Sequence, residues 1–212
     1  MGAKKVLVLG ATGGTGQQVV TQGLKLGFEV TAFVRNPQGL SATSDRLRVL
    51  TGNVLDDDHA LAAAVKGQDA VISTLGVGKS FHSGGLIAGS ATRVVRAMEA
   101  AGVRRLIWTS AFGVGDTIRD TPLVPRIFIR LLLQDVYRDK EAGEAVIDRS
   151  TLDWTVVHPV GLSDRPGTGT YRVGEHRKLR GFPTIARADV ASCLLALVDD
   201  VTLLNRHVLV TN

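Results

Sequence analysis

A glycine-rich segment near the start of the chain has the composition of a phosphate-binding turn. It reads Gly10-Ala11-Thr12-Gly13-Gly14-Thr15-Gly16 and lies between an apolar run at 5–9 and a helical pattern at 14–27. Glycines let the backbone approach a pyrophosphate, and the N-terminus of the following helix favours its negative charge. The spacing is G-x-x-G-x-x-G instead of the G-x-G-x-x-G of standard dehydrogenases, but the strand before it and the helix after it are the required context. We therefore expect a dinucleotide to contact Gly10, Thr12, Gly13, Gly14, Thr15 and Gly16.

Arg35 ends the next apolar run, at 29–34, where NAD-binding enzymes carry an acidic residue for the ribose 2′-hydroxyl. Asn36 follows it, and no carboxylate lies nearby in the sequence. A guanidinium group binds a phosphate through two parallel hydrogen bonds. The residue type therefore favours NADP(H) over NAD(H), with a surface arginine at a strand end as the alternative.

The segment 165–187 concentrates the positive charge of the chain. It contains six basic residues and one acidic residue, an excess equal to the net charge of +5. Arginine-rich segments suit phosphate or carboxylate ligands, although a solvent-exposed loop is an equally acceptable interpretation. Aromatic residues make up 5% of the chain and no nucleic-acid-binding motif is present, so we expect no nucleic-acid partner.

Length and composition predict one domain. A chain of 212 residues with 44% hydrophobic residues can bury a sizeable core. The single cysteine, Cys193, excludes an intramolecular disulfide and a cysteine-based zinc site, and no histidine or carboxylate spacing predicts a metal. No apolar run is long enough for a membrane span and no leader pattern precedes residue 5, so we expect a cytoplasmic protein without membrane contacts, a monomer or a weak homodimer.

Short apolar runs alternate with helical patterns along the chain. Strands are predicted at 5–9, 29–34, 47–50, 69–75, 104–109, 154–157 and 207–210. Helices are predicted at 14–27, 57–66, 86–101, 121–149 after Pro125, and 188–198. This alternation predicts βαβ units, and hence a single α/β Rossmann domain at 1–212: a doubly wound parallel sheet with helices on both faces. The stretch 160–187 reads as irregular and, together with 112–149, should shape a substrate pocket.

Several short motifs together resemble a known family. They are Gly10-Ala11-Thr12-Gly13, Gly52-Asn53-Val54, Leu75-Gly76, Gly67-Gln68-Asp69-Ala70-Val71-Ile72 and Thr109-Ser110-Ala111-Phe112. The chain resembles the atypical, NmrA-like branch of the short-chain dehydrogenase/reductase superfamily, and within it the NADPH-dependent flavin reductases and biliverdin-IXβ reductases. The resemblance extends over nearly the whole chain and implies a Rossmann fold and NADP(H) as the cofactor.

The resemblance also implies roles for individual residues. Asn53 and Val54 would hold the adenine, Leu75 and Gly76 would line the adenine-ribose side, and Ser110, His158 and Pro159 would lie at the nicotinamide. Tyr137 and Lys140, with Ser110, would be the catalytic residues; their spacing is Y-x-x-K instead of the usual Y-x-x-x-K. The expected substrate contacts are Phe112, Arg172, Arg177 and Arg180. Lys140 and Gly161 stand where the flavin reductase carries histidines, which puts a tetrapyrrole substrate in doubt.

Two functions follow from these expectations. The first is an NADPH-dependent reductase that transfers hydride to a planar, anionic small molecule such as a flavin, a tetrapyrrole or a quinone. The alternative is a non-catalytic NADP(H)-sensing regulator of the NmrA type. Tyr137, Lys140 and Ser110 favour the enzyme. A sugar-nucleotide epimerase would need a larger substrate domain than the segment after Pro159 provides.

Overall fold

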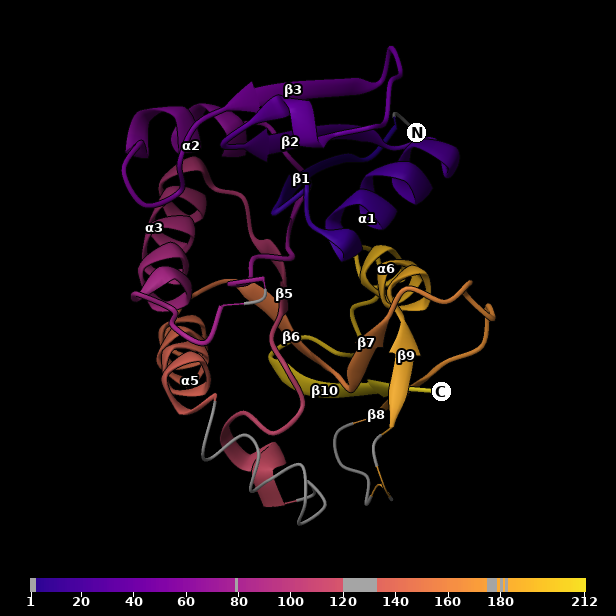
Figure 1. Ribbon diagram of the computed structural model, residues 1–212. Helices are drawn as coiled ribbons and strands as arrows, with labels where there is room; N and C mark the ends of the chain where they lie inside the picture. Colours follow the sequence, from indigo (N-terminus) through magenta and orange to yellow (C-terminus); the bar gives the residue numbers. More distant parts are fainter. Residues whose placement is uncertain (1–2, 79, 120–132, 175–178, 180, 182) are drawn as a thin grey trace.

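A computed structural model describes residues 3–78, 80–119, 133–174, 179, 181 and 183–212. Seven parallel strands are β1 (Lys5–Leu9), β2 (Glu29–Val34), β3 (Leu47–Thr51), β4 (Ala70–Ser73), β5 (Arg105–Thr109), β6 (Asp153–Pro159) and β10 (Arg206–Thr211). An eighth, β8 (Arg172–Gly174), pairs antiparallel with β10. They form one sheet in the order β3-β2-β1-β4-β5-β6-β10-β8 (Figure 1). The order reverses beside β1, and this is where an open parallel sheet binds its ligand.

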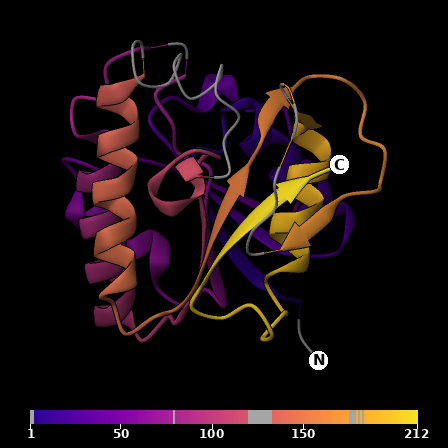
Figure 2. The same cartoon turned by 90° about the horizontal axis from the view of Figure 1, so that it is seen from below.

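Helices cover both faces of the sheet. One face carries α1 (Gly14–Lys25) and α6 (Arg187–Ala196), and the other carries α2 (Asp58–Val65), α3 (Leu86–Ala101) and α5 (Gln134–Asp148). Figure 2 shows the sheet between α5 on one side and α6 on the other. Alternate residues of β1 point to opposite faces, so Val6 and Val8 pack with α1 and α6, while Leu7 and Leu9 pack with α2 and α3. The predicted doubly wound α/β fold is confirmed.

The stretch 160–187 is more regular than the sequence predicts. It contains β7 (Gly161–Ser163) and β9 (Thr184–Ala186), which form a small parallel sheet of their own, in addition to β8. These strands are only three residues long, too short for a periodic pattern to be read from the sequence. The prediction of an irregular segment is wrong at these positions.

The helix predicted at 121–149 begins later in the described structure. Helix α5 starts at Gln134, and residues 120–132 lie outside the described residues. Short 3-10 turns, η1 (Pro37–Gly39) and η2 (Gly115–Arg119), follow β2 and β5. Among the described helices, none combines the length and the apolarity that crossing a bilayer requires.

Candidate cofactor site

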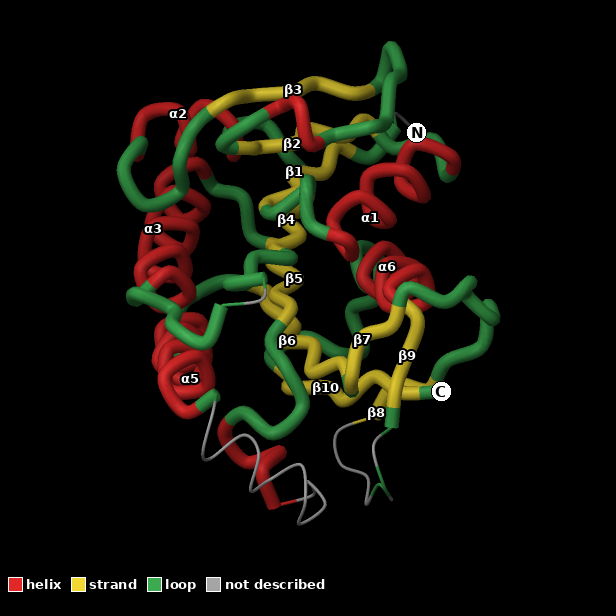
Figure 3. Tube along the Cα trace, viewed as in Figure 1, coloured by secondary structure: helices red, strands yellow, loops and turns green. Residues whose placement is uncertain are grey.

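A cavity of about 450 Å³ lies where β1, β2, β3 and β4 end. Residues of the loops that follow these four strands line it, and Figure 3 shows these loops at the ends of the strands. Its described lining includes eight of the predicted cofactor residues: Gly10, Thr12, Gly13, Arg35, Asn53, Val54, Leu75 and Gly76. A groove at this edge of a doubly wound sheet, with a glycine-rich turn in its wall, is the place where such folds bind a dinucleotide.

The glycine-rich turn is tight enough to require its glycines. Gly10 has a φ of +76°, and a Cβ placed there would lie 2.8 Å from the carbonyl oxygen of Thr74. A Cβ on Gly16 would overlap the Gly10 carbonyl oxygen. The Gly13 N–H donates to that same oxygen at 3.0 Å, and Gly13 has no side chain with which to cap α1. The first turn of α1 is thus left without a side-chain cap, as a phosphate-binding helix N-terminus needs.

Arg35 lies at the end of β2, exposed, and lines the same cavity as the glycine-rich turn. The loop that follows it is held against the turn by Gln17, whose Nε2 donates to the carbonyl oxygens of Thr12 at 3.1 Å and Gly39 at 3.3 Å. No aspartate or glutamate is present in the described lining of the cavity. A guanidinium at this point suits the 2′-phosphate of NADP(H).

Asn53 lines the cavity but its amide already has partners within the chain. The Nδ2 donates to Asp56 Oδ2 at 2.5 Å, and the Oδ1 accepts from the Leu55 N–H at 3.1 Å. The resemblance implies a hydrogen bond with the exocyclic amine of adenine, which is a donor, so the amine would bond Asn53 Oδ1 beside the Leu55 N–H. The contact with adenine stays a prediction.

Ser110, immediately after β5, is the predicted catalytic residue with the clearest partner. It is buried, and its hydroxyl donates a short hydrogen bond to Glu144 Oε1 on α5. Lys140 is one turn away from Glu144 on the same helix and interacts with it electrostatically. Burial lowers the pKa of the Lys140 ammonium, while the carboxylates of Glu144 and Asp139 oppose this effect. The structure therefore brings Ser110 and Lys140 to one carboxylate.

Tyr137 lies on α5 three residues before Lys140. Its hydroxyl donates to the carbonyl oxygen of Phe112 at 3.2 Å. Burial raises the pKa of the Tyr137 phenol to about 12. A phenol with a raised pKa and an existing acceptor is a poor proton donor at neutral pH. The catalytic role of Tyr137 stays a prediction, and it would require the hydroxyl to exchange the Phe112 carbonyl for the substrate.

Sequence reasoning missed Glu144. It is 5% exposed, and burial raises the pKa of its carboxyl group to about 7, while the bond from Ser110 acts in the opposite direction. The four-residue spacing from Lys140 places both on one face of α5, a signal that the sequence contained. The cavity also includes residues that the sequence did not single out, among them Thr74, His82 and Ser83.

His158 is buried and hydrogen-bonded within the protein. It is 1% exposed; its Nδ1 bonds the carbonyl oxygen of Ala111 at 3.0 Å, and its Nε2 lies 3.1 Å from His207 Nδ1. Both ring nitrogens are thus engaged within the protein, and the placement of His158 and Pro159 at the nicotinamide, which would involve their backbone, stays a prediction. Pro159 is buried, and its carbonyl oxygen accepts the Phe112 N–H at 3.0 Å.

The predicted substrate contacts are only partly described. Phe112 is half-buried next to Pro159, and Arg172 is exposed on β8 opposite Thr211. Arg177 and Arg180 lie outside the described residues. Gly14, Thr15, Gly16 and Ser110 are absent from the described lining of the cavity, although the first three begin α1 beside it.

Comparison with known proteins identifies the family. A family model described as NAD(P)H-binding matches residues 10–201, nearly the whole chain. This chain belongs to the NAD(P)H-binding family. It binds NAD(P)H, and we expect this cofactor at the glycine-rich turn and in the cavity described above.

Relatives of this NAD(P)H-binding protein carry varied names. A Bacillus subtilis protein named "uncharacterized sugar epimerase YhfK" is 30% identical over 207 residues, covering 95% of this chain and 91% of the relative. Among structures, a short-chain dehydrogenase/reductase from Veillonella parvula in complex with NADP is 18% identical with a TM-score of 0.84, covering 99% of this chain and 94% of that one. ChuY of Escherichia coli O157:H7, titled an anaerobillin reductase, is 24% identical with a TM-score of 0.82, covering 98% and 97%. These two structures share the fold.

Proposed function

We propose that this protein is a reductase that uses NADPH in preference to NADH and acts on a planar, anionic acceptor such as a flavin, a tetrapyrrole or a quinone-like molecule. When bound, NADPH supplies a hydride. The observation that carries the proposal is the position of Ser110. It follows β5, the strand next to β4, and the residues after β4 form a wall of the cofactor cavity. An extended dinucleotide with its adenine end at Arg35 would direct its nicotinamide toward Ser110.

Separate groups of residues would bind the cofactor and the acceptor. The first turn of α1 would hold the pyrophosphate, and Arg35 would bind the 2′-phosphate. Ser110, oriented by Glu144, would hydrogen-bond the acceptor, and Lys140 beside the same carboxylate would supply positive charge or a proton. Arg172 on β8 would contact an acidic group of the acceptor. Most of the acceleration would come from holding the acceptor against the cofactor in the correct orientation.

The proposal is tested by following loss of the NADPH absorbance with FMN, riboflavin, a biliverdin, a quinone and an aldehyde, with NADH as the control donor. We expect turnover with a planar acceptor and preference for NADPH. Lys140→Met should lower kcat by roughly 100-fold or more, the usual contribution of a positioned proton donor, and Ser110→Ala should also lower kcat, because it removes the hydroxyl that would contact the acceptor. An epimerase reaction, suggested by the printed name of the Bacillus subtilis relative, would consume no NADPH, so net oxidation separates the two.

A regulatory protein that senses NADP(H) is the second candidate function. The hydrogen bond and the raised pKa of the Tyr137 phenol favour it. The phenol that would serve as the acid is bonded to Phe112 and holds its proton tightly. Tight NADPH binding without turnover on any acceptor of the panel would favour this function over the reductase.

A further inference from the structure

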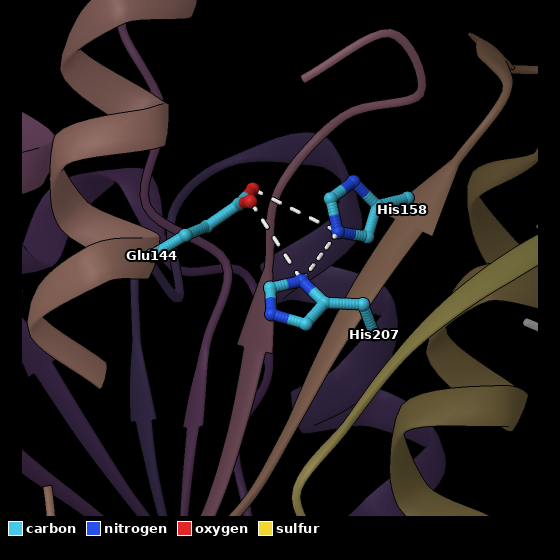
Figure 4. Close-up of side chains that lie close together, drawn as sticks. All are labelled: Glu144, His158 and His207. Atoms are coloured by element: carbon cyan, nitrogen blue, oxygen red, sulfur yellow. Dashed lines mark hydrogen bonds and ion pairs between the residues drawn. The ribbon is translucent and has the colours of Figure 1, made fainter. Parts of the chain in front are cut away.

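Three side chains from three separate elements lie close together, and one of them accepts the hydrogen bond from Ser110. They are Glu144 on α5, His158 on β6 and His207 on β10 (Figure 4). His158 Nε2 lies 3.1 Å from His207 Nδ1, 3.8 Å separate His158 Nε2 from Glu144 Oε1, and 3.7 Å separate His207 Nδ1 from Glu144 Oε2. Glu144 and His158 are almost completely buried, and His207 is partly exposed. The point on which they converge is thus enclosed on one side and reachable from the other.

The outer hydrogen bonds of the two imidazoles fix which nitrogens carry hydrogen. His158 Nδ1 bonds the carbonyl oxygen of Ala111 at 3.0 Å, and His207 Nε2 bonds Asp148 Oδ1 at 2.9 Å. A carbonyl oxygen and a carboxylate only accept, so these two nitrogens donate. In the neutral imidazoles, His158 Nε2 and His207 Nδ1 therefore present lone pairs to each other and to the Glu144 carboxylate. A cation at this point, either a proton or a metal ion, would be attracted by all three groups.

The geometry fits a tetrahedral metal ion better than a single proton. Metal–ligand bonds of about 2.0–2.1 Å give a tetrahedron with edges of roughly 3.3 Å. The two histidine nitrogens, 3.1 Å apart, match that edge closely. The carboxylate faces them through different oxygens, with Oε1 3.8 Å from His158 Nε2 and Oε2 3.7 Å from His207 Nδ1, so it must move toward the histidines to bring one oxygen, or both, to the ion. A proton on His207 Nδ1 would satisfy only one of its two facing acceptors. Two histidines and one glutamate are also a known zinc ligand set.

The second shell has the arrangement that metal-binding histidines require. Such a histidine usually donates its other N–H to a carboxylate or a backbone carbonyl, which fixes the ring. Asp148 does this for His207 and Ala111 for His158, while Ser110 donates to Glu144. Lys140 is the nearby cation that would compete for Glu144, and the two carboxylates Glu144 and Asp148 would balance a divalent charge.

We propose that Glu144, His158 and His207 form a binding site for one Zn²⁺ ion. The site is separate from the cofactor cavity and does not depend on the proposed reductase activity. It would connect α5 to β6 and β10, because Glu144 lies on the helix and the two histidines lie on these neighbouring strands. It would also fix Glu144, and through it the Ser110 hydroxyl.

The test is titration of the chelator-treated full-length protein with ZnCl₂ by isothermal calorimetry. We expect one ion per chain and a rise in Tm with Zn²⁺, because an ion that binds only the folded state stabilises it. Co²⁺ in place of Zn²⁺ should give the visible absorption bands of four-coordinate cobalt. His207→Asn and Glu144→Gln should abolish this binding, and Asp148→Asn should weaken it by about 10- to 100-fold, as expected for a second-shell partner.

His59→Asn is the matched control, because His59 is exposed on α2, far in sequence from the cluster. It should leave the zinc isotherm unchanged. NADPH binding by the His207→Asn variant shows that this variant is folded. Absence of one-to-one binding in the wild type, or unchanged binding in both His207→Asn and Glu144→Gln, overturns the proposal. In that case ¹⁵N NMR of the imidazoles should show a proton between His158 and His207 that Zn²⁺ does not displace.

Discussion

The side chain of Arg187 lies against Gly14 at the start of α1, so close that a Cβ on Gly14 would come within 2.7 Å of the Arg187 Cδ. Its Nε bonds Asp164 Oδ1 at 2.8 Å, and the Asp164 side chain is 85% exposed. The guanidinium is therefore next to the helix N-terminus where the pyrophosphate is expected, and it is held there by a surface carboxylate. Arg187 belongs to the basic segment 165–187, but its sequence position alone does not place it at the cofactor.

Arg187→Ala should weaken NADPH binding by about tenfold, the loss of one hydrogen bond to a charged group. Asp164→Asn should have the opposite effect, tightening binding by about two- to threefold, because it frees the guanidinium from a weak surface ion pair. Fluorescence titration with NADPH measures both. Effects of opposite sign are the specific expectation; weaker binding by both variants would mean that the ion pair only stiffens the loop.

Arg35→Ala should reduce discrimination between the two cofactors. Loss of the charged hydrogen bonds to the 2′-phosphate should raise the Kd for NADPH by roughly 10- to 100-fold and leave that for NADH nearly unchanged. Arg48→Ala, an exposed change on the edge strand β3, serves as the control for lost charge. An equal effect of Arg35→Ala on both cofactors would contradict the assignment of Arg35 to the 2′-phosphate.

Gly10→Ala should disrupt the glycine-rich turn. The φ of +76° costs an alanine about 1–2 kcal/mol, and the methyl group would also press on the Thr74 carbonyl. NADPH binding should be lost, with a lowered Tm. Gly174→Ala on β8 is the control, because no atom lies within 4 Å of a Cβ built there; it should have no effect on either measurement.

Arg105→Ala should destabilise the whole domain. The buried guanidinium donates to the Leu197 carbonyl at 3.0 and 2.6 Å, to the Asp153 carbonyl at 2.8 Å and to Thr155 Oγ1 at 3.0 Å. Its removal leaves buried acceptors without donors, at a cost of about 3 kcal/mol, which lowers the Tm of a chain of this size by roughly 6–12 °C. Thermal unfolding, monitored by circular dichroism, measures this decrease in Tm. The neighbouring Arg104→Ala removes only an exposed ion pair with Asp153 and should have a much smaller effect.

Cys193 should react with thiol reagents only when the protein unfolds. The side chain is 1% exposed, and burial raises the pKa of its thiol to about 12. In the unfolded chain this thiol titrates near pH 8.5, so the stability that burial of the neutral thiol provides is complete below that pH and is lost as pH rises toward 12. Labelling with a disulfide reagent at pH 8 should be slow, and slower still with NADPH. The stability difference between wild type and Cys193→Ala should shrink from pH 8 to pH 10; a constant difference would contradict the pKa shift.

Local features of the cofactor site could be predicted from the sequence because neighbouring residues make them. Gly10, Gly13 and Gly16 lie within one turn between a strand and a helix, and their backbone requirements do not depend on distant residues. The position of Arg35 could be predicted for the same reason, because this residue comes directly after β2 in the sequence. The doubly wound arrangement, though not the strand order, follows from the alternation of strands and helices together with the handedness of the crossovers.

The polar cluster behind Ser110 could not be predicted in this way. Glu144, His158 and His207 come from a helix and two strands, and only the pairing of β10 with β6 places His207 beside His158. The hydrogen bonds of Tyr137 to the Phe112 carbonyl and of His158 to the Ala111 carbonyl also join segments far apart in the chain, so the sequence does not predict them. The sequence alone thus determined the fold class and the cofactor turn, because periodicity and backbone conformation are local. Only the tertiary structure decided which titratable side chains share one buried point, because that depends on packing between residues far apart in the chain.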